Sequence, residues 1–136
     1  MENYPRVHAD IDLDAIRYNM EQMHHLTDPH TKLMAVIKTD GYGHGAIPIA
    51  RELEPLDYVY GYAVAAEEEG IALRSAGIKK PILILGYAFP EQYEALLRAQ
   101  ITPAVFTLEA AQRLSETAKR LGLAAHIHIK LDTGMG

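Results

Sequence analysis

Hydrophobic and polar positions along the chain alternate between two kinds of segment, one with the spacing of strands and one with the spacing of helices. Short apolar or alternating runs predict strands over residues 9–13, 32–38, 58–63, 81–85, 102–106 and 125–132. Apolar residues three to four positions apart predict helices over 14–26, 46–54, 65–76 and 108–121, with a further helix after Pro90. Thr107 suits the N-cap and Gly122 the C-cap of the helix over 108–121. The pattern therefore predicts an α/β protein.

The regular exchange of strands and helices predicts parallel strand pairing with right-handed crossovers. Five strands of this series follow the helix that begins at Asp14. A doubly wound sheet can be complete with five strands, whereas an eight-stranded barrel would be only partly built, so the strand count leaves both folds open. The ending "LDTGMG" comes directly after a strand, without a helix to cover it. This arrangement favours a piece of a larger fold.

Composition narrows the classes of partner. The 136 residues are 49% hydrophobic, which is enough for one core, and the net charge of −5 disfavours nucleic acids and anionic membranes as partners. The chain has no cysteine, which excludes disulfides, thiolate zinc sites and cysteine nucleophiles. It has neither an apolar run of membrane-spanning length nor the pattern of a signal peptide. We therefore expect no membrane association and a cytoplasmic location.

The candidate chemistry lies in the stretch "LMAVIKTDGYGHGA", residues 33–46. An apolar strand ends there at Lys38, and a loop follows in which three glycines alternate with Tyr42 and His44. In parallel α/β folds, the carboxyl ends of the strands carry the active site, although a strand-end lysine can also simply reach solvent. The glycines allow sharp turns and close approach of a ligand to the backbone. The spacing matches neither a Walker motif nor GxGxxG.

The segment "AVIKTDGYGHGA" resembles the pyridoxal-phosphate attachment segment of the alanine racemase family. Further resemblance extends in order through "ADIDLDAIRYNM", "GYAVAAEEEGIALRSAGI", "PILILGY" and "HIHIKLDTGMG", which together cover nearly the whole chain. One local departure is the run Thr39, Asp40 and Gly41, where the family often has Ala-Asn-Ala. Members of the family are several hundred residues long, so we expect this chain to be the N-terminal portion.

The resemblance implies a fold and a division into domains. The expected fold is a partial (β/α)8 TIM-type barrel with about five of its strands, preceded by a short strand and a helix. Residues 1–13 would form a leading strand that belongs with a C-terminal β domain outside this sequence. Residues 14–136 would form the incomplete barrel domain that binds pyridoxal phosphate.

The resemblance also implies roles for four residues. Lys38 would form a Schiff base with pyridoxal 5'-phosphate and act as a base at the substrate α-carbon, chemistry that suits a lysine amine. Tyr42 and Leu85 would lie beside the cofactor, and Lys130 matches a lysine that can be carbamylated. A tyrosine that packs under the glycine loop, and a surface pair of Lys130 with Asp132, are the ordinary alternatives. His44 is interpreted as a residue that fixes the loop.

The activity implied by the resemblance is the interconversion of L- and D-alanine, which supplies D-alanine for peptidoglycan. Its second base would be a tyrosine from the C-terminal domain of a partner subunit, so a homodimer is expected. The 136-residue chain alone is expected to be inactive. The alternatives are a racemase for another amino acid, such as serine, or a non-catalytic pyridoxal-phosphate carrier.

A different class of enzyme is suggested by the strand "HIHIKLD". His126 and His128 share one face of this strand, as metal ligands of a hydrolase could, while Ile127 and Ile129 should face the helices. This reading leaves the glycine loop at Lys38 unexplained, and we therefore expect no metal. The acidic run over 67–69 is interpreted as the solvated start of a helix.

Overall fold

Five strands form a sheet in which every neighbouring pair is parallel. The computed structural model describes residues 7–134. Its elements are α1 (Leu13–His25), β1 (Leu33–Val36), α2 (Lys38–Tyr42), α3 (Ala46–Leu53), β2 (Val59–Val64), α4 (Glu67–Ser75), β3 (Ile82–Ile84), the 3-10 helix η1 (Pro90–Gln92), α5 (Tyr93–Arg98), β4 (Thr102–Val105), α6 (Leu108–Leu121) and β5 (His128–Ile129).

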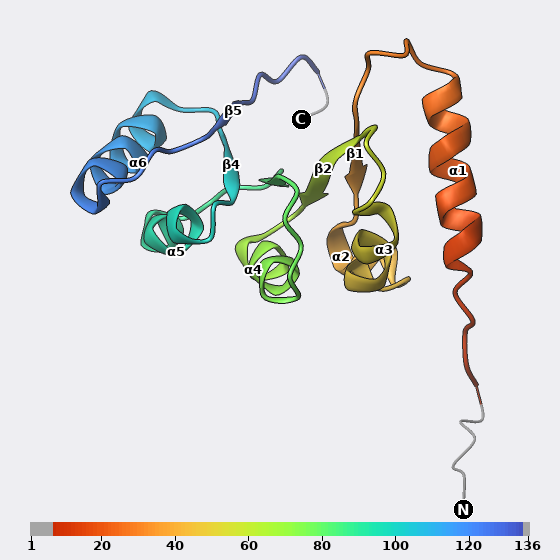
Figure 1. Ribbon diagram of the computed structural model, residues 1–136. Coiled ribbons are helices and arrows are strands. Elements are labelled where there is room, and N and C mark those ends of the chain that lie inside the picture. Colours follow the sequence, from red (N-terminus) through yellow and green to blue (C-terminus); the bar gives the residue numbers. More distant parts are fainter. Residues whose placement is uncertain (1–6, 135–136) are drawn as a thin grey trace, which may run out of the picture.

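The order of the strands across the sheet identifies the fold. The order is β1-β2-β3-β4-β5, the same as in the sequence, without the reversal that defines a doubly wound sheet. Helices α3, α4, α5 and α6 follow one another around one side of the curled sheet, as Figure 1 shows. A barrel grows in this way, because each right-handed crossover moves one strand further in the same direction. The expectation of a partial TIM-type barrel is confirmed.

The main core lies between the sheet and its helices. Its largest fully buried side chains include Tyr62 and Ile84 from the sheet and Leu53, Leu73 and Leu96 from the helices. The Tyr62 hydroxyl donates to Ala50 O at 2.7 Å and lies 3.0 Å from Glu54 Oε2. Burial, and then the neighbouring Glu54 carboxylate, raise the pKa of this phenol. The helical side of the sheet is therefore the packed side.

The beginning of the chain differs from the strand expected over 9–13. Residues 9–12 pair with no strand of the described chain, and the expected strand ends before Leu13, which is already the first residue of α1. The helix begins there because the Asp12 carboxylate accepts a hydrogen bond from Ala15 N at 3.0 Å and caps it. The pairing of this segment with a C-terminal domain stays a prediction. Residues 1–6 of the expected leading segment lie outside the described residues.

The last strand is shorter than the one expected over 125–132. Only His128 and Ile129 are paired as a strand with β4, although Lys130 N still donates to Val105 O at 2.9 Å. The expected apolar face is only partly buried: Ile127 lies with the side chains of α6, whereas Ile129 and Leu131 are largely exposed. No described helix follows β5, and this leaves the end of that face uncovered.

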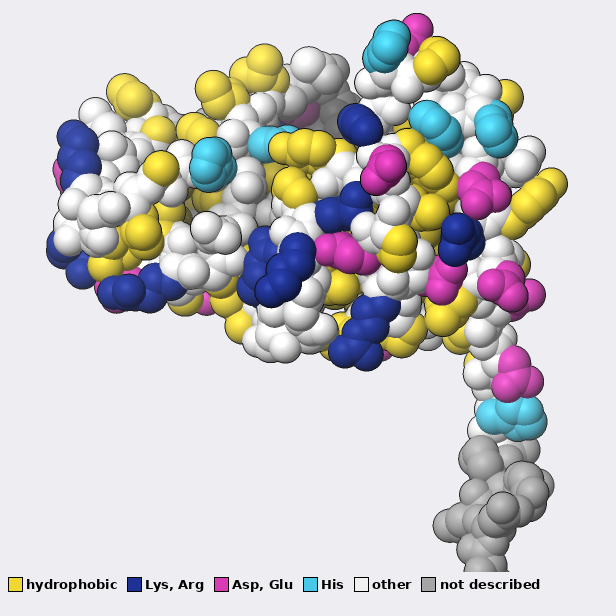
Figure 2. Space-filling view, in the orientation of Figure 1, with side chains coloured by type: hydrophobic (Ala, Val, Ile, Leu, Met, Phe, Trp, Pro, Cys, Tyr) yellow, Lys and Arg dark blue, Asp and Glu magenta, His cyan; other side chains and the backbone are white. Residues whose placement is uncertain are grey.

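The exterior is polar and mixed in charge on the face seen in Figure 2. Lys and Arg side chains are interspersed there with Asp and Glu side chains, and hydrophobic side chains lie between them. The longest described helix, α6, has 14 residues, and no described helix has both the length and the hydropathy needed to cross a bilayer.

Candidate functional site

Lys38 lies at the carboxyl edge of the sheet, directly after β1. Ile37 N continues the strand ladder by donating to Ala63 O at 2.9 Å, and its side chain is buried in the core with that of Ala35. Val36 lies on the other face, and Lys38 begins the turn that follows the strand. Lys38 is half-buried. The lysine therefore stands at the carboxyl rim of the curled sheet, where TIM-type barrels place their chemistry.

The segment after Lys38 is a left-handed turn where a glycine-rich loop was expected, and β1 ends at Val36 instead of at Lys38. Five consecutive residues have positive φ, namely Thr39, Asp40, Gly41, Tyr42 and Gly43, with φ of 54°, 50°, 63°, 56° and 84°. For residues other than glycine this region costs about 1–2 kcal/mol each, because Cβ crowds the following carbonyl. Such strain is characteristic of functional sites, and surrounding contacts must hold it in place.

Hydrogen bonds within the loop hold this turn in shape. Gly45 N donates to Asp40 O at 2.8 Å, and the Asp40 side chain accepts from Ala46 N at 2.9 Å. His44 Nδ1 lies 3.0 Å from Gly41 O, so that this nitrogen carries the proton and donates it. This contact agrees with the interpretation of His44 as a residue that fixes the loop. The loop is thus closed on itself and joined to the first turn of α3.

The Asp40 carboxylate gives a measurable prediction. Replacing Asp40 with alanine should lower the stability of the full-length protein by about 1–2 kcal/mol, because α3 loses its capping acceptor and alanine tolerates positive φ less well than aspartate. Thermal unfolding measures the effect. Asp40→Asn is the matched control, since it keeps an acceptor oxygen and a residue type that enters the left-handed region. Equal melting temperatures for the two variants would contradict the capping role.

The three carboxylates of the acidic run over 67–69 differ from one another. Glu68 is exposed, as expected for a solvated helix start, and the pKa of Glu67 is raised by burial and by repulsion from Glu68. Glu69 is half-buried and folds back, with Oε2 accepting from Ala65 N at 2.7 Å. The expectation of a fully solvated run is therefore wrong for Glu69.

Glu69 also reaches the lysine loop, which the sequence reasoning missed. Its Oε1 accepts from Thr39 N at 2.6 Å, and Thr39 is the residue next to Lys38. The only signal in the sequence is the position of Glu69 three residues after Ala66, the place of the acidic partner in a capping box. That signal indicates a contact with the helix N-terminus, but it gives no indication of the bond to Thr39, which lies 30 residues away in sequence.

Two of the other three predicted site residues directly follow strands of the same sheet, and the third, Tyr42, lies in the loop after Lys38. Leu85 directly follows β3, is half-buried, and donates through its N–H to Val64 O at 2.8 Å. Lys130 directly follows β5 and is exposed, whereas Tyr42 lies within the left-handed turn with 59% of its surface exposed. Because all the strands are parallel, Lys38, Leu85 and Lys130 lie along one edge of the sheet. Their roles toward a cofactor stay predictions.

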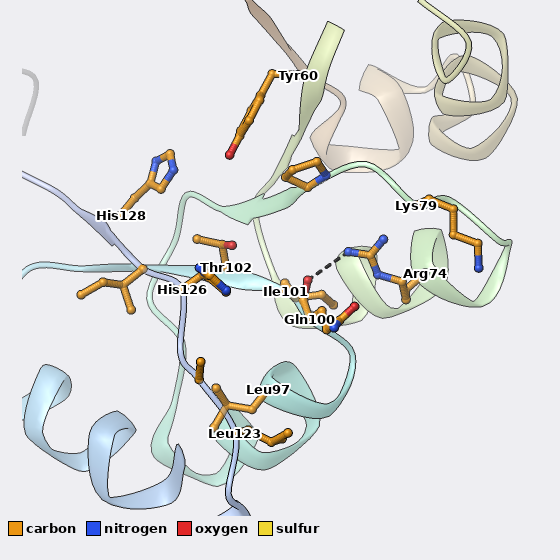
Figure 3. A pocket seen from close by; sticks show the side chains of 13 residues that line it. Tyr60, Arg74, Lys79, Leu97, Gln100, Ile101, Thr102, Leu123, His126 and His128 are labelled. Carbon is orange, nitrogen blue, oxygen red and sulfur yellow. Dashed lines mark hydrogen bonds between the residues drawn. The ribbon is translucent and has the colours of Figure 1, made fainter. Parts of the chain in front are cut away.

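The two histidines of the metal hypothesis line a cavity of about 570 Å³ at the other edge of the sheet. Figure 3 shows His126 and His128 there with Tyr60, and Thr102 marks the beginning of β4. Within residues 7–134, no group of three or more His, Cys, Asp or Glu side chains is placed to hold a metal ion. The histidine pair therefore lines a cavity that does not include Lys38, and it lacks further ligands in the part of the chain that is described.

The guanidinium of Arg74, which lines this cavity, is hydrogen-bonded to the backbone. Its guanidinium donates to the carbonyl oxygens of Ile78 at 2.6 Å, Ala99 at 2.9 Å, Gln100 at 3.0 Å and Lys80 at 3.2 Å. Burial lowers its pKa. Arg74 therefore fastens the loops that lead into β3 and β4, and its donors are directed at carbonyls.

Comparison with known proteins connects this arrangement to one family. Residues 11–136 match the family profile described as "Alanine racemase, N-terminal domain". The chain is 46% identical over 129 residues to the alanine racemase of Desulfovibrio desulfuricans, covering 95% of this chain and 34% of that protein. The solved alanine racemase of Clostridium difficile 630 superposes with a TM-score of 0.89 at 45% identity, over 92% of this chain and 33% of that one.

A second structure of the Clostridium difficile enzyme, in complex with cycloserine, gives the same TM-score of 0.89 and the same identity of 45%. It covers 92% of this chain and 34% of that one. The chain thus spans about a third of the length of the relatives that it matches.

Proposed function

The chain belongs to the alanine racemase N-terminal domain family, and on this premise we propose that it forms the cofactor-holding part of an enzyme that interconverts L- and D-alanine. One observation carries the proposal: the candidate lysine stands at the carboxyl end of a barrel strand, and a strained left-handed turn holds it there. A strand-end lysine that merely reached solvent would not need such a turn, because the positive φ of each non-glycine residue in the turn costs free energy on folding.

The residues at this rim fit pyridoxal 5'-phosphate. Lys38 is half-buried at the carboxyl end of its strand, and a lysine amine can form a Schiff base with the aldehyde of the cofactor. Leu85 is a partly buried apolar side chain on the same edge, suitable for contact with a flat ring, and Tyr42 presents an exposed aromatic ring from the loop. Lys130, if carbamylated, would carry an acid group at the opposite end of the same edge.

Pyridoxal phosphate, when bound, supplies a ring that withdraws electrons from the substrate α-carbon and so weakens its C–H bond. Lys38 Nζ would hold the cofactor covalently in the resting protein and move a proton to or from one face of that carbon. Inversion of configuration requires the proton to return on the opposite face, which calls for a second base. We assign this base to a residue outside the present sequence.

The remaining parts of the proposal concern the whole protein. Residues 14–136 would form the barrel domain, and the segment before α1 would belong with a C-terminal β domain. A homodimer would bring a tyrosine of the partner subunit to the second face of the substrate. The small substrate is an amino acid, in keeping with the cycloserine complex of the Clostridium difficile relative. The product would serve peptidoglycan synthesis, and the location would be the cytoplasm.

The activity can be tested with the full-length protein, pyridoxal phosphate and L-alanine in D2O. We expect D-alanine to accumulate, with deuterium at its α-carbon, because each inversion exchanges that proton with a base. Chiral chromatography and mass spectrometry measure both. Faster turnover of L-serine than of L-alanine would instead support the alternative substrate, and cofactor binding without turnover of either amino acid would support a carrier.

The 136-residue chain alone serves as the control for this assay. It should give no racemisation even with excess pyridoxal phosphate, since the second base is assigned outside it. Turnover by this chain alone would contradict the two-base proposal.

A further inference from the structure

Glu69 connects the carboxyl ends of the first two strands. Oε1 accepts from Thr39 N, one residue after the candidate lysine, at 2.6 Å. Oε2 accepts from Ala65 N at 2.7 Å and from Ala66 N at 3.4 Å, directly after β2. The carboxylate therefore lies between the loop that carries Lys38 and the start of α4, and it touches both through backbone groups.

The chemistry of this contact calls for a carboxylate. All three backbone partners are N–H donors, so each oxygen must act as an acceptor. An ionised carboxylate has two acceptor oxygens, and hydrogen bonds to a charged group are stronger than neutral ones. A glutamine of the same shape has one acceptor oxygen, and it would place its NH2 group against one of the backbone N–H groups.

The contact also lies where the loop has most need of an anchor. Thr39 is the first residue of the left-handed turn, with φ of 54°, and its peptide group is shared with Lys38. The hydrogen bonds to Gly41 O and Asp40 O run within the loop itself and hold its shape. The bond from Glu69 reaches across 30 residues and fixes the turn relative to a neighbouring strand.

We propose that Glu69 is a positioning residue that directs the Lys38 amine by holding the Thr39 N–H and thus the beginning of the left-handed turn. The inference rests on the proposed role of Lys38 in holding pyridoxal phosphate. Glu69 itself takes no part in the reaction. Its effect is to keep Lys38 ordered before the cofactor arrives, so that the lysine does not have to be immobilised during binding.

The test compares Glu69→Gln with Glu68→Gln in the full-length protein. Both substitutions remove one charge from the same helix turn, but Glu68 is exposed, so only the first should disturb the loop. Hydrogen exchange at the Thr39 amide should be at least tenfold faster in Glu69→Gln. Borohydride trapping of pyridoxal phosphate on the Lys38 peptide should be slowed about tenfold, and kcat should fall further than KM changes.

A third variant and a second reagent keep the result interpretable. Glu69→Ala removes both acceptors and should exceed Glu69→Gln in each effect. Reductive methylation of Lys38 with formaldehyde should be no slower in Glu69→Gln than in Glu68→Gln, because a loosened lysine is more accessible. The melting temperatures of the two variants are compared as well, so that a general loss of folding in Glu69→Gln is recognised. Slow trapping with unimpaired methylation therefore identifies lost positioning.

The proposal is overturned if Glu69→Gln matches Glu68→Gln in Thr39 exchange and in trapping at Lys38. These readouts do not depend on racemase activity. If the unmodified protein traps pyridoxal phosphate but does not racemise alanine, the proposed function fails while Glu69 is still judged by exchange and trapping. If the unmodified protein does not trap the cofactor on Lys38, both proposals fail.

Discussion

Replacing Lys38 with alanine should abolish racemisation in the full-length protein, with a loss of at least about 10³-fold in kcat/KM. The substitution removes the amine proposed to hold pyridoxal phosphate and the base proposed for one face of the substrate, and a positioned base alone contributes about 10²–10⁴-fold. Borohydride trapping should at the same time yield no labelled peptide containing residue 38. Chiral chromatography of the product and mass spectrometry of the labelled peptides measure the two effects.

Lys130→Ala is the matched control, since Lys130 also follows a strand at this edge but is exposed. It should retain trapping at Lys38, although its turnover falls if a carbamylated Lys130 contributes an acid group. Labelled cofactor found on Lys130 in the unmodified protein would show that the wrong lysine has been assigned. Undiminished turnover by Lys38→Ala would reject the proposed chemistry itself.

Replacing Gly61 with alanine should destabilise the protein by about 3 kcal/mol and lower its melting temperature by roughly 5–10 °C. A Cβ at this position of β2 would lie far inside contact distance of Pro81 O. This oxygen cannot retreat without a further cost, because it accepts the hydrogen bond from Tyr62 N at 2.9 Å that opens the pairing of β2 with β3. Thermal unfolding followed by circular dichroism measures the change.

Gly77→Ala separates this steric effect from the general cost of replacing a glycine. No heavy atom lies within 4 Å of a Cβ at residue 77, but its φ of 92° makes alanine strained, so a loss of about 1 kcal/mol is expected. If Gly61→Ala is no more destabilising than Gly77→Ala, β2 and β3 separate more easily near Gly61 than the structure indicates.

The alternation of apolar residues predicted the central strands well, because their burial follows from local sequence. The expected strand over 58–63 is β2 at Val59–Val64, and the helix over 108–121 begins and ends as its caps Thr107 and Gly122 indicated. Such features depend on residues a few positions apart. The choice between a doubly wound sheet and a barrel depends on the order of strands in space, which hydrophobic spacing does not encode. The resemblance, together with the last strand that no helix follows, favoured the barrel.

The errors occur where a polar side chain satisfies a backbone group at a distance or at a helix end. Asp12 looked like the polar member of an alternating strand, but it caps α1. Glu69 looked like one of three solvated carboxylates, although its partner Thr39 lies 30 residues earlier. The three glycines indicated a loop with sharp turns, but five consecutive positive φ angles were not expected, because Thr39 and Tyr42 are residue types that rarely adopt positive φ. Tertiary contacts override local preference at these positions.

The sequential strand order has a consequence for biosynthesis. Each strand pairs with the strand made just before it, so contacts between strands close short loops and need no distant part of the chain. A ribosome releases the chain from its N-terminus, and β1 can therefore find β2 as soon as Val64 has emerged. Glu69 follows a few residues later. The lysine, its left-handed turn and its carboxylate anchor can thus assemble while most of the barrel is still being translated.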